Sequence, residues 1–186
     1  MVSAGKPAKR SSASRGLSLT VLKGIRLFAT DVDGVLTDAG MYYSESGDEW
    51  KKFNTRDGMG IKLLQKAGLI TAIVTQERTR LVARRAEKLA IPELHQGVMD
   101  KLSVIRDMAT RHGISLRQVA YIGDDINDVE ALEAVGFSAA PADGLSQVLE
   151  IVDYVCLKRG GEGAVRELAE MILLSRNEAK TSKQRR

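Results

Sequence analysis

The 186-residue chain has one cysteine, two histidines and three prolines, and aromatic residues make up only 4% of it. The single Cys156 excludes an internal disulfide framework and favours a reducing, cytoplasmic compartment. His95 and His112 stand far apart with no cysteine beside them, which argues against a zinc site. No apolar run approaches the roughly 20 residues that a membrane span needs, and the basic N-terminus lacks the apolar segment of a signal peptide. We therefore expect a cytoplasmic protein with no membrane partner.

Basic charge is concentrated at the two ends of the chain. The 28 Lys and Arg residues outnumber the 24 Asp and Glu residues, for a net charge of +4. Residues 1–15 and 176–186 each contribute +4, so the body between them carries −4. A nucleic-acid partner needs clustered positive charge on the folded surface, so none is expected. Residues 1–18 and 177–186 are predicted to be disordered basic tails, which leaves one domain over residues 19–176.

Apolar runs alternate with helical periodicity throughout this domain. Buried strands are predicted at residues 25–30, 69–75, 118–122, 137–140 and 154–157. Helices are predicted at residues 59–67, 79–89, 101–112, 127–135, 145–151 and 164–174. The alternation indicates an α/β fold, a Rossmann-like parallel sheet with helices on both faces, and ligands are expected beyond the carboxyl ends of its strands.

One segment, residues 41–54, breaks the alternation. β-forming residues flank Ser46-Gly47-Asp48, a pattern that predicts a projecting β-hairpin. The segment also carries the only tryptophan, Trp50. An isolated hairpin is marginally stable in water, so this one is expected to pack against something, with a partner subunit as a reasonable candidate.

Two carboxylates, Asp31 and Asp33, follow the first predicted strand. Positions two residues apart in an extended chain share a face, so both acids point toward one region. Such a pair is expected to be held by a shared proton or by a cation. The alternative is an Asp-Gly turn in which one acid caps a helix.

Three further carboxylates follow the predicted strand that ends at Ile122, in the run Gly123-Asp124-Asp125-Ile126-Asn127-Asp128. Oxygen-only ligands at the ligand-binding edge of a sheet suit Mg²⁺ better than zinc. Ordinary helix capping by Asp124 or Asp125 is the alternative for this run alone.

A hydroxyl and an ammonium group complete a set suited to phosphoryl transfer. Thr75 ends the second predicted strand, and Lys101 opens a helix after a loop. In such a set one carboxylate attacks phosphorus while a metal ion, a hydroxyl and a lysine neutralise the phosphoryl oxygens.

These four motifs, in this order, resemble those of the haloacid dehalogenase superfamily phosphatases over roughly residues 24–174. By that resemblance Asp31 would be the nucleophile that forms an aspartyl-phosphate, and Asp33 would protonate the leaving alcohol and later activate water. Mg²⁺ would be held by Asp31, the backbone carbonyl of Asp33, and Asp124. Thr75 and Lys101 would bind the phosphoryl group.

The resemblance also implies supporting roles for residues around these motifs. Gly34 and Asn127 are expected to bind phosphate, and Asp125 and Asp128 to support the metal site without holding the ion directly. The spacings from Asp33 to Thr75 and on to Lys101 are too short for an inserted cap domain. Such a capless site is open, so neighbouring subunits are expected to contribute to specificity.

The hairpin and the glycine-rich segment 158–167 resemble those of the capless tetrameric phosphatases of ulosonic acids. That resemblance implies a homotetramer acting on a phosphorylated sugar acid. The substrate is either 3-deoxy-D-manno-octulosonate 8-phosphate, of lipopolysaccharide synthesis, or 2-keto-3-deoxynononate 9-phosphate. An N-acylneuraminate 9-phosphate is a further alternative, and a non-catalytic module associated with a cytidylyltransferase is an alternative of a different class.

Few residues discriminate between these substrates. The acid at the third position of Thr75-Gln76-Glu77 resembles the enzymes of the nine-carbon substrate, which is therefore favoured. By analogy Glu77, Lys88 and Asn54 would contact the sugar acid, with Lys88 pairing with its carboxylate. A solvent-facing helix charge is the other interpretation of Lys88. Gln76 departs from both patterns and adds a side chain beside the phosphate site.

Overall fold

Six parallel strands form the central sheet, in the order β5-β4-β1-β6-β7-β8. The computed structural model describes residues 19–184, with side chains from residue 20 to residue 177. The strands of the sheet are β1 (Leu27–Thr30), β4 (Ile70–Thr75), β5 (Glu93–Gln96), β6 (Val119–Ile122), β7 (Phe137–Ala140) and β8 (Tyr154–Val155). The predicted α/β fold is thereby confirmed, whereas the predicted tail over residues 1–18 lies outside the described residues.

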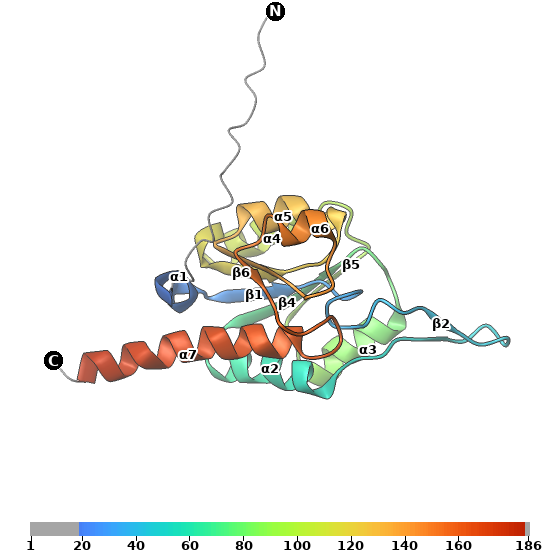
Figure 1. The fold of residues 1–186 in the computed structure, drawn as a ribbon, viewed down its shortest axis with the longest axis horizontal. Coiled ribbons are helices and arrows are strands. Elements are labelled where there is room, and N and C mark those ends of the chain that lie inside the picture. The colour runs from blue at the N-terminus through green and yellow to red at the C-terminus, as the bar shows by residue number, and fades with distance from the viewer. Residues whose placement is uncertain (1–18, 185–186) are drawn as a thin grey trace, which may run out of the picture.

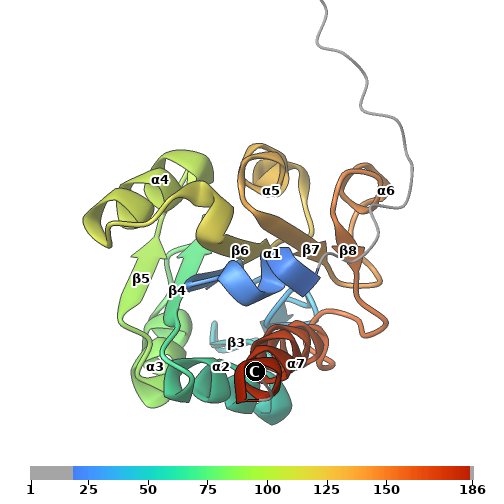
Figure 2. The ribbon, with the colours of Figure 1, turned by 90° about the vertical axis from the view of Figure 1, so that its left-hand side faces the viewer.

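Helices cover both faces of the sheet (Figure 1). Seen along the strands, one face carries α4 (Lys101–Arg111), α5 (Val129–Ala134) and α6 (Ser146–Leu149), and the other carries α2 (Thr55–Lys66), α3 (Arg80–Leu89) and α7 (Ala164–Gln184) (Figure 2). The short α1 (Leu19–Gly24) precedes β1, and the 3₁₀ turns η1 (Leu116–Gln118) and η2 (Ile126–Asp128) flank β6. None of the described helices is long and apolar enough to cross a membrane.

Alternation of side chains along β1 divides the core into two layers. Phe28 packs among apolar residues of α2, α3 and α7, while Leu27 and Ala29 pack among those of α4, α5 and α6. All three side chains are fully buried. Because β1 lies between β4 and β6, the chain that leaves its carboxyl end emerges at the middle of the sheet edge.

The strand register determines which residues meet at that edge. Thr30, the last residue of β1, is aligned with Ile73 on β4 and with Ile122 on β6. Asp31 continues the alignment, since its backbone N–H donates to the carbonyl of Ile122 at 3.0 Å. The segments that follow Thr30, Thr75 and Ile122 therefore converge.

The predicted hairpin is present and projects from the carboxyl edge of the sheet (Figure 1). Its strands β2 (Tyr42–Tyr43) and β3 (Glu49–Trp50) pair antiparallel, with Tyr42 opposite Trp50. Its apolar side chains are largely exposed: Met41 by 44%, Tyr42 by 43%, Tyr43 by 65% and Trp50 by 51%.

The structure differs from the sequence-based expectation at three elements. One is the helix α1, where no helix is predicted. β5 was not expected, because its residues Glu-Leu-His-Gln form no apolar run; it is an edge strand and only half-buried, so its sequence need not be apolar. Disorder was expected from residue 177, but α7 continues to Gln184. The added residues include Glu, Ala, Lys and Gln, which favour helix.

Candidate active site

The loop after β1 carries Asp31 and Asp33 and turns sharply at Gly34. The backbone N–H groups of Leu36 and Thr37 both donate to the carbonyl of Val32, at 2.9 and 3.0 Å. Gly34 has a φ of +78°, and a Cβ there would lie 1.9 Å from Oδ2 of Asp124. Only glycine therefore allows the first motif and the β6 motif to approach this closely.

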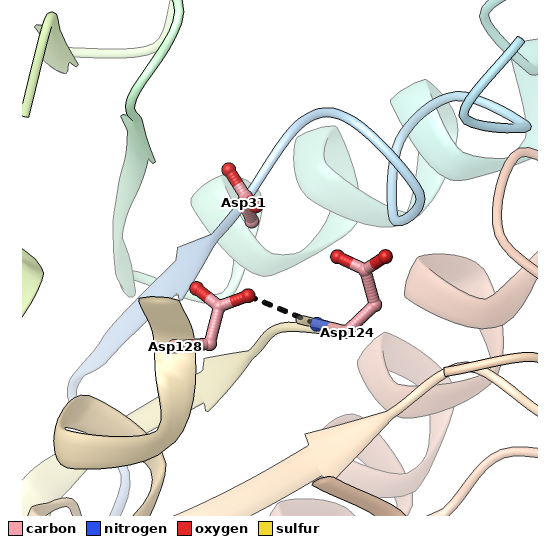
Figure 3. A group of neighbouring side chains, drawn as sticks. All are labelled: Asp31, Asp124 and Asp128. Atoms are coloured by element: carbon pink, nitrogen blue, oxygen red, sulfur yellow. Dashed lines mark hydrogen bonds between the residues drawn. The ribbon is translucent and has the colours of Figure 1, made fainter. Parts of the chain in front are cut away.

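Three carboxylates converge beside this loop. Asp31, Asp124 and Asp128 each offer an oxygen within 4.8 Å of the others, and Figure 3 shows Asp124 and Asp128 beside the loop that carries Asp31. Asp31 comes from the end of β1, whereas Asp124 and Asp128 come from the segment after β6. The two acidic motifs of the sequence thus form one cluster.

Asp128 organises the cluster from a fully buried position. Its Oδ1 accepts from Nζ of Lys101 at 2.6 Å and from the hydroxyl of Tyr121. Its Oδ2 accepts from the backbone N–H groups of Asp124 and Asp125, at 3.0 and 3.2 Å. These contacts anchor the chain after β6, and they occupy both oxygens of Asp128.

Lys101 is the cation inside the cluster. It begins α4, which Asp100 caps by accepting from the N–H of Ser103, and only 2% of Lys101 is exposed. Its Nζ lies 2.9 Å from Oδ2 of Asp31 as well as 2.6 Å from Asp128. Burial by itself would lower the pKa of Lys101, but the two carboxylates outweigh burial and raise it, so the ammonium is charged at neutral pH.

One positive charge does not balance three clustered acids, of which Asp31 and Asp128 are buried and Asp124 is half-buried. Burial, with repulsion from Asp128, raises the pKa of Asp31 to about 7 against the opposing effect of Lys101. Burial, with repulsion from Asp31, Asp128 and Asp125, raises the pKa of Asp124 to about 8. Among the described residues, Oδ1 of Asp31 and Oδ1 of Asp124 are buried without a hydrogen-bond partner. Two unpartnered carboxylate oxygens that are short of positive charge fit a hard divalent cation such as Mg²⁺.

A pocket of about 470 Å³ opens in front of the cluster. Its lining residues are Asp31, Asp33, Met41, Thr75, Gln76, Glu77, Asp125 and Asn127. Lys101 adjoins this pocket through Asn127, with Nζ of Lys101 3.4 Å from Oδ1 of Asn127. Two carboxylates beside a buried lysine, a threonine and a candidate cation site can transfer a phosphoryl group to and from a carboxylate.

Comparisons with known proteins agree with this chemistry. Residues 87–168 match the family model described as haloacid dehalogenase-like hydrolase. The chain is 39% identical to 3-deoxy-D-manno-octulosonate 8-phosphate phosphatase of Salmonella typhi over 165 residues. The aligned residues cover 89% of this chain and 88% of that protein. The chain belongs to this phosphatase family. It is therefore a phosphoric monoester hydrolase of the capless haloacid dehalogenase type.

Solved structures of the same phosphatase family share the fold. The enzyme from Moraxella catarrhalis superimposes with a TM-score of 0.84 at 40% identity, over 89% of this chain and 96% of that one. That structure holds a magnesium ion, a phosphate ion and a KDO molecule. The enzyme from Yersinia pestis gives a TM-score of 0.84 at 40% identity, over 87% of this chain and 88% of that one. Mg²⁺ as the cofactor agrees with the Moraxella catarrhalis structure and with the acid cluster of this chain.

Lys51 is a site residue that the sequence does not predict. Its side chain has no exposed area, and its Nζ donates to Oδ1 of Asp33 at 2.6 Å and to Oε2 of Glu77. Burial alone would lower the pKa of Lys51, but the hydrogen bonds to Asp33 and Glu77 outweigh it and raise the pKa. In the sequence Lys51 is one of two adjacent lysines on a hairpin, and no local signal separates it from Lys52.

Two of the residues expected to contact the sugar acid lie elsewhere in this chain. Asn54 caps α2, with Oδ1 accepting from the N–H of Arg56 at 2.8 Å, and its Nδ2 donates to the carbonyl of Gly161 at 3.1 Å. Lys88 is exposed in the last turn of α3, at the opposite end of that helix from the β4–α3 loop that borders the pocket. The helix runs back along the sheet, so it carries Lys88 away from the pocket of its own subunit.

Gln76 contacts another residue of the pocket. Its Oε1 accepts from Nδ2 of Asn127 at 2.9 Å. Asn127, one of the residues expected to bind phosphate, thereby has its amide oriented by Gln76 on one side and by Lys101 on the other.

The glycine-rich segment before α7 packs on the catalytic loop. A Cβ at Gly160 would lie 1.9 Å from the carbonyl oxygen of Gly34, and the N–H of Gly161 donates to the carbonyl of Val35 at 3.0 Å. Asp57 of α2 is fully buried and accepts from the N–H of Arg166 at 2.8 Å, so it caps α7 from a neighbouring helix. The segment therefore supports the position of the loop that carries Asp33.

Proposed function

We propose that this phosphatase hydrolyses the 8-phosphate of 3-deoxy-D-manno-octulosonate. The observation that carries the chemistry is the pair Asp31 and Asp33, which face one pocket at the end of β1 with the Lys101 ammonium 2.9 Å from Asp31. The substrate is supported by the names of the relatives, which match 89% of the chain at 39% identity. It is also supported by the KDO molecule in the Moraxella catarrhalis structure.

Asp31 is the nucleophile in this proposal. One of its oxygens attacks phosphorus, and the bond between phosphorus and the sugar oxygen breaks as Asp33 gives that oxygen a proton. The resulting aspartyl-phosphate is hydrolysed when Asp33, now ionised, takes a proton from a water molecule that attacks phosphorus. Inorganic phosphate leaves, and Asp31 and Asp33 return to their starting states.

The other site residues neutralise and position the phosphoryl group. Mg²⁺ would be held by Asp31, Asp124 and the backbone carbonyl of Asp33, and it supplies positive charge that neutralises phosphoryl oxygens. Lys101 and Thr75 bind the remaining oxygens, and Lys101 screens Asp31 from the anionic phosphate that it attacks. Asp128 holds Lys101 and the backbone of Asp124 in place.

The preference for 2-keto-3-deoxynononate 9-phosphate expected from the sequence stays a second candidate. Of the residues on which it depends, Glu77 lines the pocket, whereas Asn54 and Lys88 do not. Glu77 is also engaged by Lys51, so its carboxylate alone is weak support for nine carbons over eight.

The test is Mg²⁺-dependent phosphate release from the eight-carbon and the nine-carbon substrate, with Asp31→Asn as the blank. A higher kcat/KM for the octulosonate supports the proposal. A higher kcat/KM for the nononate keeps the mechanism and makes the substrate assignment wrong. Phosphate release that survives in Asp31→Asn contradicts the nucleophile.

We further propose that the chain assembles as a homotetramer through the hairpin. Exposed aromatic residues on a projecting ribbon are typical of a subunit interface, and Tyr43 and Trp50 are 65% and 51% exposed. Sedimentation of the double variant Tyr43→Ser, Trp50→Ser is expected to show smaller species than the parent. The control Leu174→Ser removes an apolar side chain that is 63% exposed on α7, and it is expected to leave the assembly unchanged. A parent protein that sediments as a monomer contradicts this proposal.

A further inference from the structure

Lys51 connects three segments that are distant in the sequence. It follows β3 at the base of the hairpin, and its ammonium group lies between Asp33 of the β1 loop and Glu77 of the β4 loop. The Lys51 side chain has no exposed area, whereas those of Asp33 and Glu77 are 34% and 35% exposed. The lysine is therefore enclosed behind two carboxylates that face the pocket.

Both hydrogen-bond donors near the Asp33 carboxyl group contact the same oxygen, Oδ1. Lys51 donates to Oδ1 at 2.6 Å, and the hydroxyl of Thr37, which is shared with the carbonyl of Val32 at 3.3 Å, lies 3.4 Å from the same oxygen. Two donors on one oxygen restrict rotation of the carboxyl group. A side chain that transfers a proton must hold its oxygen within hydrogen-bond reach of the reacting atom, and a displacement of about 1 Å can cost about 100-fold in rate.

Glu77 keeps the ammonium in this place. Without a second acceptor, the ammonium of Lys51 could either stay on Asp33 or turn to solvent, since a lysine side chain has four flexible bonds. Because Glu77 contacts the same ammonium group as Asp33, the position of that group is fixed by two carboxylates. The ammonium in turn fixes the two carboxylates relative to each other. The neighbour Lys52 has no such role, because its side chain is 56% exposed and its Nζ lies 3.3 Å from Asp38.

We propose that Lys51 is a positioning residue for proton transfer by Asp33. This rests on the acid role proposed above for Asp33. As the bond between phosphorus and the leaving oxygen breaks, the proton of Asp33 passes to that oxygen, and Lys51 holds the carboxyl group in the orientation that makes the transfer direct. Loss of Lys51 therefore slows the cleavage of poor leaving groups, which need the proton, more than that of good ones, which do not.

The experiment compares phenyl phosphate with p-nitrophenyl phosphate. The two esters have nearly the same shape, so contacts with the sugar play no part, and kcat/KM reports the steps up to departure of the phenol. Lys51→Gln is expected to lower kcat/KM for phenyl phosphate by about 10-fold or more, and that for p-nitrophenyl phosphate by less than about 3-fold. Lys51→Arg, which keeps a donor and a charge, is expected to recover most of the phenyl phosphate activity.

Two reference variants separate this proposal from the proposed function. Asp33→Asn is expected to show the same selective loss in larger form, and Lys52→Gln is expected to leave both rates within about 2-fold of the parent. If Asp33→Asn loses both rates equally, the acid role of Asp33 fails. If Asp33→Asn is selective but Lys51→Gln lowers both rates equally, the role of Lys51 is overturned and that of Asp33 stands.

A folding defect is distinguished by thermal unfolding of each variant and by a second substitution. Glu77→Gln removes the far anchor of Lys51 but leaves the lysine in place. It is expected to reduce the ratio of phenyl to p-nitrophenyl phosphate activity in the same direction, by a smaller factor. A ratio equal to that of the parent in both Lys51→Gln and Glu77→Gln overturns the proposal. If Lys51→Gln does not fold, the ratio in Glu77→Gln decides it.

Discussion

Substitution of Gly34 by alanine tests the close approach on which the candidate metal site depends. The added Cβ would lie 1.9 Å from Oδ2 of Asp124, and contacts below 3.0 Å are essentially never found, so the carboxylate has to move by more than about 1 Å. Asp124 is one of the two residues with an unpartnered buried oxygen facing the cluster. We expect Gly34→Ala to weaken Mg²⁺ binding by about 10- to 100-fold, or about 1.4 to 2.7 kcal/mol.

The same substitution also has a backbone cost in stability, and a matched control variant measures that cost separately. Gly34 has a φ of +78°, where a residue with a Cβ loses about 1 to 2 kcal/mol. Gly68, at the end of α2, has a φ of +82° and no atom within 4 Å of an added Cβ. Gly68→Ala is therefore expected to show only the backbone cost, a decrease in Tm of about 2 to 8 °C for a chain of this size.

Titration calorimetry with Mg²⁺ and urea unfolding of both variants separate the two effects. Gly34→Ala should lose Mg²⁺ affinity and about 100-fold in kcat/KM, while Gly68→Ala should lose neither. Equal Mg²⁺ affinity in the two variants would falsify the steric argument, because it would mean that Asp124 accommodates the methyl group without leaving its position.

Four further predictions follow from the charges of the described residues. Mg²⁺ affinity should rise from pH 6 to pH 9, and binding should release protons. The reason is that without metal the pKa values of Asp31 and Asp124 are raised to about 7 and 8, whereas the cation needs both carboxylates ionised. Calorimetry in two buffers that shows no proton release contradicts this. The same raised pKa values mean that the folded metal-free protein binds protons more tightly than the unfolded chain. Its free energy of unfolding should therefore decrease between about pH 4 and pH 8, and urea midpoints that increase over that range would be the opposite of what we expect. Asp128→Asn should cost about 3 to 5 kcal/mol in urea unfolding, since it removes the buried anion that Lys101 and two backbone N–H groups share, and a loss below about 1 kcal/mol would refute that role. Hydrogen bonds from Arg111 are the main reason that the pKa of Glu93 is lowered to about 2. The contribution of Glu93 to stability is therefore present above its ordinary pKa and lost as the pH falls toward 2. Glu93→Gln should lower the urea midpoint at pH 7 but not at pH 2, and an equal effect at both pH values rules this out.

Local sequence was sufficient for the elements whose pattern is strong. β1, β4 and β6 are four- to six-residue apolar runs that end beside Asp31, Thr75 and Gly123, and parallel strands bring such ends to one edge. The convergence of Asp31, Asp33, Thr75 and Asp124 could therefore be predicted before any contact was known. β5 could not, because an edge strand is half-buried and its sequence carries little apolar signal.

Residues that act through distant partners were beyond the reach of local patterns. Lys51 and Lys52 are equivalent in the sequence, yet one is enclosed between Asp33 and Glu77 and the other is largely exposed. Asn54 and Lys88 were assigned to the pocket by resemblance alone, and the direction of α3 and the capping of α2 place them elsewhere in this chain.

The sequence by itself determined the parallel α/β sheet, the order of the acidic motifs along the chain, and the chemical types that meet at the sheet edge. Hydrophobic period and strand ends are local properties, and burial of the apolar runs leaves few alternatives. Only the tertiary structure decided which oxygens of the acid cluster are left unpartnered, that Asp128 serves Lys101, and that Lys51 reaches Asp33. The contacts of Lys51 with Asp33 and of Lys101 with Asp128 join residues 18 and 27 positions apart, and the acid cluster joins segments still more distant in the sequence; such distances are set by packing.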